Sequence, residues 1–302
     1  MKRIGLILAL LLAGLAPVWG QVTVTVGLDQ DQFLPGEAMP LTVRITNRSG
    51  QTLGLGAEED WLTFTVEAQD GQVVPKLGDT PVAGRFLLES SKVAVKHVDV
   101  APFFSFGQSG HYRVVATVRV PGWDHDLSSQ PKSFDVIEGA KLWERDFGVP
   151  RAGGSTNAVP EVRRYMLQQA NYIRGQLRLY LRVMDTSGKV LRVLPIGGML
   201  SFSRPEPQLD KFSNLHVLYQ SGPHTFMYTE YSPDGELIAR QYYEYVNARP
   251  HLRLDEEGNI TVASGMRRQT QNDFPPVPPT ISDNTPSTSP PPAVVDDKSK
   301  KP

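Results

Sequence analysis

The chain has 302 residues, no cysteine, and 31 basic against 32 acidic residues, which gives a formal net charge of −1. The absence of cysteine excludes a disulfide framework and thiol catalysis. The near-neutral balance, with no basic block, lacks the electrostatic signature of a nucleic-acid-binding protein. The length allows two domains.

Residues 1–20 have the pattern of a cleaved secretory signal peptide. Lys2 and Arg3 precede an apolar run over residues 4–15, and Gly20 offers a small residue at the cut. An uncleaved membrane anchor is the alternative, but the run is shorter than the ~20 residues of a spanning helix. No later apolar stretch approaches that length. We therefore expect an exported protein, periplasmic or extracellular in a bacterium, that starts near Gln21. Two basic residues leave with the signal, so 29 basic against 32 acidic residues give a charge of −3.

Residues 21–138 show short stretches in which apolar and polar residues alternate, the pattern of half-buried strands. Strands are expected at 22–26, 41–46, 61–66, 92–100, 112–120 and 133–137. Asp70-Gly71 predicts a hairpin turn, and the alternation in 92–100 changes phase at Lys96-His97, which predicts a bulge. About seven short strands at this spacing favour a β-sandwich.

Three motifs in this region resemble the immunoglobulin-like and fibronectin-like modules of exported bacterial proteins. They are Phe33-x-Pro35-Gly36-Glu37, Leu41-x-Val43-x-Ile45-x-Asn47 and Gly110-x-Tyr112-x-Val114-x-Ala116. The resemblance implies an immunoglobulin-like antiparallel β-sandwich, with Tyr112 as a corner tyrosine and Trp61 in the core. It implies little about function, because this architecture serves many roles.

Residues 139–160 are expected to form a junction, with a loop over 148–160 that is rich in glycine and proline. Trp143 and Phe147 are apolar anchors that would hold the junction against one of the domains.

Residues 161–268 contain an internal repeat of about 45 residues. Leu209-Asp210, three residues and Asn214-Leu215-His216-Val217 recur as Leu254-Asp255, three residues and Asn259-Ile260-Thr261-Val262. The turns Asp185-Thr186-Ser187-Gly188 and Ser232-Pro233-Asp234-Gly235 recur at a similar spacing. The pattern predicts an antiparallel β-sheet domain of about two hairpin repeats, in which residues 163–170 form a strand rather than a helix.

The repeat unit resembles the blades of bacterial β-propellers. A closed propeller needs at least four blades, and the domain has room for about two and a half. We therefore expect a compact antiparallel sheet domain, and the alternative is a ring completed by partner chains. Residues 269–302 are rich in proline, serine and threonine, and are predicted to be a disordered tail.

Candidate catalytic or metal-binding groups are sparse in the sequence. Asp124-His125-Asp126 follows a turn, and in an extended segment His125 would point away from the two aspartates. His97 and Asp99 could share one face of a strand, but no third ligand lies at a familiar spacing. His216 is replaced by Thr261 in the second repeat, which indicates an outward strand position. No serine-hydrolase elbow, zinc-protease motif or phosphate loop occurs. The sequence therefore predicts a non-catalytic protein without cofactor or metal.

Tyrosine and arginine side chains on the repeat strands are the best candidates for a working surface, because both residue types are enriched at interfaces. The predicted binding residues are Tyr180, Arg182, Arg240, Tyr242, Tyr243, Tyr245 and Arg249. We expect an exported binding or scaffolding protein whose partner is another envelope or secreted protein, or a polysaccharide. The alternatives are a carbohydrate-binding or enzyme-accessory protein that uses this tyrosine surface, and a protease-inhibitor-like module that uses an exposed loop over 78–85.

Overall fold

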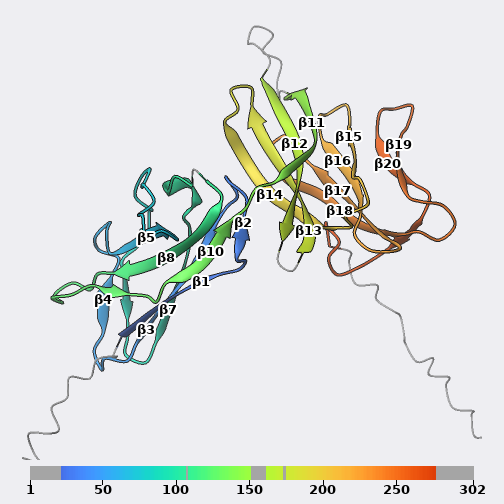
Figure 1. The fold of residues 1–302 in the computed structure, drawn as a ribbon. Coiled ribbons are helices and arrows are strands. Elements are labelled where there is room, and N and C mark those ends of the chain that lie inside the picture. Colours follow the sequence, from blue (N-terminus) through green and yellow to red (C-terminus); the bar gives the residue numbers. More distant parts are fainter. Residues whose placement is uncertain (1–21, 107, 151–160, 173–174, 277–302) are drawn as a thin grey trace, which may run out of the picture.

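The computed structural model describes residues 22–106, 108–150, 161–172 and 175–276 (Figure 1). Across these residues the protein is all-β, as predicted, with a short 3-10 turn at Ala101–Phe103 and no α-helix. Its sheets are antiparallel except for one parallel pair, and none of them closes into a barrel or ring. No helix in the described part of the chain has the length and apolar character needed to cross a membrane. The predicted signal peptide lies outside the described residues.

The N-terminal unit contains two main sheets and one small one. The first has the order β1 (Val22–Leu28), β3 (Pro40–Asn47) and β7 (Val93–Asp99). The second has the order β2 (Gln32–Phe33), β10 (Lys132–Val136), β8 (Gly110–Val118) and β5 (Leu62–Ala68), with β9 (Leu127–Ser128) beside β8. β4 (Leu53–Leu55) pairs with β6 (Phe86–Leu88).

The alternating apolar residues of these strands point into one shared core. Trp61 is buried there, and its Nε1 donates a hydrogen bond to the carbonyl oxygen of Val82 at 2.7 Å. The Tyr112 hydroxyl donates to the carbonyl oxygen of Gln108 at 2.6 Å, four residues upstream. That contact has the form of a tyrosine corner. Each large apolar side chain buried here stabilises the fold by about 1.5–3 kcal/mol.

The bulge predicted at Lys96-His97 is wrong. β7 pairs with β3 in unbroken register, from Asp99 opposite Pro40 to Val93 opposite Thr46. β7 lies at the edge of its sheet, and its outward-facing Val93 and Val95 stay exposed. These exposed valines produce the change of phase in the sequence without any irregularity in the backbone.

The C-terminal unit has three sheets. The first has the order β11 (Ala140–Gly148), β12 (Val162–Tyr172), β13 (Gln176–Asp185) and β14 (Val190–Met199). The second has the order β15 (Glu206–Leu209), β16 (Leu215–Gln220), β17 (Thr225–Tyr231), β18 (Leu237–Glu244) and β21 (Met266–Arg268). The third pairs β19 (His251–Leu254) with β20 (Ile260–Ala263).

Strand β11 lies in the segment that the sequence analysis treats as a junction. It pairs along β12, and the ring of Phe147 stacks on Tyr165 with their centroids 4.0 Å apart. Phe147 and Trp143 thus anchor this segment to the C-terminal unit and make its first half a strand. β12 confirms the strand predicted over 163–170. Residues 151–160 of the predicted loop lie outside the described residues.

The three C-terminal sheets stack face to face (Figure 1). One apolar cluster, which includes Leu181 and Val217, lies between the first and second sheets. Another, which includes Leu218 and Ile260, lies between the second and third. The opposite face of the first sheet contacts the N-terminal unit through a cluster that includes Tyr180 and Leu34. The three C-terminal sheets therefore form a linear stack, and the N-terminal unit contacts its first sheet.

The sequence repeat corresponds to hairpin turns of one kind. Positive φ angles of 85°, 64°, 74° and 81° occur at Gly188, Ser213, Gly235 and Gly258, the fourth residue of each turn. A hydrogen bond within the turn explains the Asp-x3-Asn motif at two of these turns. The carboxylates of Asp210 and Asp255 accept hydrogen bonds from the backbone N–H of the residue four positions later, at 2.8 and 2.6 Å.

The first residues of the predicted tail are part of the fold. The backbone of Phe274 exchanges two hydrogen bonds with Arg240 on the outer edge of β18, at 2.9 and 3.0 Å. Asp273 is buried and accepts hydrogen bonds from Arg267 at 2.5 Å and from the hydroxyl of Thr270 at 2.8 Å. The prediction of disorder from residue 269 is therefore wrong for 269–276, and residues 277–302 lie outside the described residues.

Candidate functional site

The predicted tyrosine and arginine residues do not form one surface. Tyr180 is 0% exposed and packs with Leu34, Ala170 and Val193 at the contact between the two units. Burial raises the pKa of its hydroxyl to about 12. The expectation that Tyr180 lies on an exposed binding face is wrong, because the N-terminal unit covers that face.

Arg178 and Arg182, which flank Tyr180 on the same face of β13, also bind the N-terminal unit. Arg182 donates to the carbonyl oxygen of Pro35 at 2.9 Å and to the side-chain oxygen of Gln168 at 3.0 Å. Arg178 donates to the side-chain oxygen of Gln30 at 3.1 Å. Burial lowers the pKa of Arg182. Within the chain, these side chains connect the two units.

The remaining five predicted residues divide between the sheet and a loop. Tyr243 and Tyr242 are adjacent on β18, so they face opposite sides of the sheet. Tyr243 packs on the cluster between the second and third sheets, and its hydroxyl donates to Gln241 at 2.8 Å. Tyr242 and Arg240 are half-buried. These side chains belong largely to the fold.

Tyr245 and Arg249 are exposed, and both belong to the loop that follows β18. Tyr245 is 43% exposed, and its ring stacks on His224 with their centroids 6.3 Å apart. The Tyr245 N–H donates to the carbonyl oxygen of His224 at 2.8 Å, which fixes this stack. Arg249 lies over the ring of Phe226, 5.3 Å from its centroid. We call Tyr245, Arg249 and His224 the loop surface.

A cleft of about 610 Å³ lies between the two units. Its lining includes Asp29, Glu37, Leu191 and Arg192, so both units contribute. Glu37 is only 4% exposed and accepts hydrogen bonds from the backbone N–H of Leu34 at 2.8 Å and from Gln30 at 2.7 Å. Burial raises the pKa of the Glu37 carboxyl.

The two His/Asp clusters that the sequence suggests remain ordinary surface groups. His125 lies on an exposed turn, where Asp126 pairs with Arg119 at 3.4 Å. His97 contacts the hydroxyl of Thr42 at 3.1 Å, and Asp99 accepts a hydrogen bond from the backbone N–H of Met39 at 2.8 Å. Among the described residues, neither cluster brings three potential ligand atoms close together.

The segment over 78–85, the proposed protease-binding loop, is largely exposed and has no regular secondary structure. Val82 at its centre is buried, and its carbonyl oxygen accepts the hydrogen bond of Trp61. The loop is thus anchored at one point, and its inhibitory role stays a prediction.

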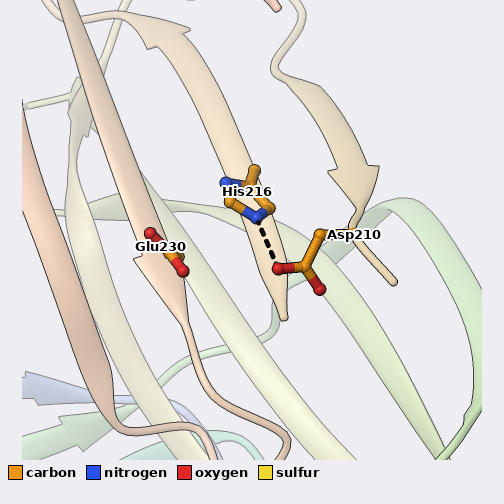
Figure 2. A group of neighbouring side chains, drawn as sticks. All are labelled: Asp210, His216 and Glu230. Atoms are coloured by element: carbon orange, nitrogen blue, oxygen red, sulfur yellow. Dashed lines mark ion pairs between the residues drawn. The ribbon is translucent and has the colours of Figure 1, made fainter. Parts of the chain in front are cut away.

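One other group of side chains converges. Asp210, His216 and Glu230 each offer an atom within 4.8 Å of the others, and among the described residues they form the one such set of potential metal ligands (Figure 2). Asp210 begins the turn after β15, and His216 on β16 lies directly opposite Glu230 on β17. The pairing of β16 with β17 therefore brings His216 and Glu230 together, and the turn at Asp210 adds the third side chain.

His216 is buried, contrary to the outward position expected from its replacement by Thr261. It is 4% exposed, whereas Thr261 is exposed. The difference arises because β16 lies inside a five-stranded sheet covered on both faces, whereas β20 lies in the last, two-stranded sheet. Two positions that match in the sequence repeat can therefore differ in burial.

Tyr228 and Asn214 make hydrogen bonds with this group. His216 Nδ1 lies 2.7 Å from the Tyr228 hydroxyl, which lies 3.4 Å from Glu230 Oε2. Burial, and secondly the charge of Glu230, raise the pKa of Tyr228. Asn214 Nδ2 donates to Asp210 Oδ2 at 3.0 Å and to Glu230 Oε1 at 3.4 Å. Glu230 and Tyr228 could not be found from the sequence, because only the strand register brings them beside His216.

Comparison with known proteins adds little to this picture. No protein-family model and no curated protein sequence matches the chain. Among solved structures, it is similar to Spo0M, a sporulation control protein from Bacillus subtilis, with 11% sequence identity over 59% of this chain and 90% of that chain. The TM-score is 0.30, too low to carry an argument about fold or function.

Proposed function

We propose that this protein is an exported, non-catalytic binding or scaffolding protein of a bacterial envelope or secretome. The observation that supports this best is the use of one face of β13 to fix the two β units to each other. An immunoglobulin-like module in front would then hold the stack of sheets behind it in one orientation.

The contact between the units has the features of a fixed joint. Two guanidinium groups donate hydrogen bonds across it, and Tyr180 and Leu34 are buried in it. Domains in one chain move relative to each other by default, and hydrogen bonds and apolar contacts between them oppose that motion. An added Cβ at Gly36 would lie 3.2 Å from a methyl of Val190, so the turn Pro35-Gly36-Glu37 approaches β14 closely. This close fit between the two units supports the proposed scaffolding role.

The loop surface is the proposed point of contact with a partner. Tyr245 and Arg249 combine a large exposed contact area with polar groups, as residues at interfaces commonly do. The stack on His224 holds Tyr245 in place before binding, which lowers the entropy lost on association.

The test is a pull-down with envelope extract of the producing cell. The wild type is compared with Tyr245→Ala/Arg249→Ala and with Leu191→Ala, a control that removes an equally exposed apolar side chain from the cleft (45% against 43%). We expect a protein that is retained by the wild type and by Leu191→Ala and lost with the double variant. Loss with Leu191→Ala alone would move the binding surface to the cleft. Retention of nothing would contradict the proposal.

A separate experiment tests the proposal that the protein is exported. The mature protein is collected from the periplasm or medium and its N-terminus is sequenced. We expect the chain to start near Gln21. A chain that stays inside the cell with Met1 in place would contradict export.

A carbohydrate-binding role is the second candidate, because the exposed Tyr245 ring, stacked on His224, is a surface on which a sugar ring can lie. The test uses purified polysaccharide from the same envelope in place of the extract. Retention that Tyr245→Phe preserves and Tyr245→Ala abolishes would favour sugar binding over protein binding.

A further inference from the structure

A buried histidine nitrogen in the second C-terminal sheet faces the carboxylate of Asp210, and Glu230 lies nearby. His216 is 4% exposed, and among the described residues its Nε2 has no hydrogen-bond partner. The nearest carboxylate oxygen, Asp210 Oδ2, lies 3.4 Å away (Figure 2). Their opposite charges attract if the ring is protonated, but the geometry does not form a hydrogen bond. A buried polar atom left without a partner destabilises the fold unless a further group satisfies it.

We propose that Asp210, His216 and Glu230 bind one divalent transition-metal ion, with Zn²⁺ as the best fit. The distance between His216 Nε2 and Asp210 Oδ2 matches the distance expected between two ligands of this ion. Two ligands at about 2.0–2.1 Å from a tetrahedral ion lie roughly 3.3–3.4 Å from each other. The distance between Nε2 and Oδ2 is 3.4 Å. Each of the three residues offers a ligand atom within 4.8 Å of the others, so a small movement of the Glu230 side chain would close the set.

The chemistry of the ligands selects the class of ion. An imidazole nitrogen favours zinc and its neighbours in the first transition series, whereas calcium and magnesium take oxygen ligands. Two carboxylates would neutralise the charge of a divalent ion. The Asp210 side chain is 9% exposed and Glu230 is partly exposed, so a water molecule can complete the coordination on the Glu230 side.

The surrounding side chains suit this role. A metal-ligating histidine usually donates its other ring N–H to a polar partner, which fixes the tautomer. His216 Nδ1 lies 2.7 Å from the Tyr228 hydroxyl, and that hydroxyl can in turn donate to Glu230. Asn214 holds Asp210 and Glu230 through one side-chain amide. Tyr228 and Asn214 are thus positioning residues for the three ligands.

The second repeat offers a matched control. Asp255 and Asn259 make the same turn, with the same backbone hydrogen bond and a side-chain hydrogen bond of 3.1 Å. Thr261 stands where the first repeat has His216. Asp255→Asn therefore changes an equivalent turn without removing a ligand, while Asp210→Asn removes one.

The experiment measures binding of Zn²⁺ alone to the purified protein, without a polyhistidine tag, by calorimetry. We expect one tight site per chain in the wild type and in Asp255→Asn. We expect affinity to fall more than about 100-fold in Asp210→Asn, Glu230→Gln and His216→Gln, and about 10-fold in Tyr228→Phe, which changes only a positioning residue. Zn²⁺ at 100 times its dissociation constant should raise the Tm of the wild type by about 5–10 °C.

A second measurement identifies the atom and holds even where a variant fails to fold. NMR of the wild type with ¹⁵N-labelled histidine follows each ring nitrogen during the titration. We expect Nε2 of His216 to shift at one equivalent of Zn²⁺, before the exposed histidines respond. An unshifted His216 Nε2, or tight binding that survives both Glu230→Gln and His216→Gln, would overturn the proposal and leave the group as a hydrogen-bonded network. Neither result depends on the partner-binding function.

Discussion

Glu37 is a carboxyl group in an environment that disfavours its charge. It lies at the joint between the two units, 4% exposed, with hydrogen bonds from the Leu34 N–H and from Gln30. These contacts stabilise the carboxylate, but burial has the larger effect and raises its pKa.

This shift gives the joint a pH dependence. Because the pKa of Glu37 is higher in the folded than in the unfolded chain, the folded state holds a proton that the unfolded state releases first. Stability should therefore fall as the pH rises from about 4.5 through the folded-state pKa. Urea unfolding of the wild type and Glu37→Gln across this range should show a flatter dependence in the variant. Glu256→Gln, at an exposed turn, is the control, and equal slopes in all three proteins would contradict the prediction.

The sequence predicts which side chains share one face of a strand better than it predicts which side chains are buried. Alternation along a strand correctly places Arg178, Tyr180 and Arg182 on one face of β13. It contains no information on whether another element covers that face, and the N-terminal unit does. His216 shows the same limit, because its burial depends on a sheet from later in the chain. Tyr245 and Arg249 remain exposed because they lie on a loop.

The hairpin turns depend on glycine to different degrees. Gly188 and Gly235 both have positive φ, so any Cβ strains the backbone. A Cβ at Gly188 would meet nothing within 4 Å, whereas one at Gly235 would lie 3.2 Å from Val183 and 3.1 Å from Arg192.

Gly188→Ala should therefore cost about 1 kcal/mol from backbone strain alone. Gly235→Ala should cost about 2–3 kcal/mol, because the methyl also disturbs the packing of the first sheet against the second. The free energy of unfolding of both variants, from urea titration, checks this. A smaller loss at Gly235 than at Gly188 would be inconsistent with the close approach.

The segment over 269–276 protects the outer edge of β18. Its two backbone hydrogen bonds at Arg240 occupy groups that an edge strand otherwise presents to another chain. A chain that ends at Arg268 should therefore self-associate through this edge. Size-exclusion chromatography with light scattering should find dimers or larger species, whereas a chain that ends at Pro276 should match the full-length protein. A strictly monomeric short chain would contradict this role.

Elements with local sequence signals could be predicted, and those set by distant contacts could not. The strands with clear alternation and the hairpin turns that end in glycine follow from short stretches of sequence. β11 does not, because its pairing with β12 depends on the stack of Phe147 on Tyr165. The docking of Phe274 likewise depends on a partner strand about 30 residues earlier, and composition favours disorder there.

The whole molecule depends on the joint between its units. Arg182→Met keeps the apolar stem of the side chain but removes its hydrogen bonds to Pro35 and Gln168. We expect a loss of about 2 kcal/mol, because two acceptors lose a charged donor. Calorimetry should change from one transition in the wild type to two, as the units uncouple. A single, merely lowered transition would show that apolar contacts alone maintain the coupling.

The order of the sheets could not be predicted from the sequence. Repeats and turns indicate stacked blade-like sheets, but the number of sheets and the docking of the N-terminal unit depend on contacts between distant faces. The same contacts position Glu230 and His216 across neighbouring strands, which explains why the metal ligands emerge only from the fold.

A linear stack gives each sheet only its nearest neighbours as partners. The β19–β20 sheet, at the end, has an apolar neighbour on one side, whereas the inner sheets have one on each. Such arrays behave like a one-dimensional chain of coupled units, in which opening begins at a free end. Native-state hydrogen exchange should then be graded along the molecule, fastest in β19 and β20, slower in β15 to β18, and slowest in β12 and β13. Local order would thus decrease toward the C-terminal end, with the proposed metal ligands in the sheet directly before it.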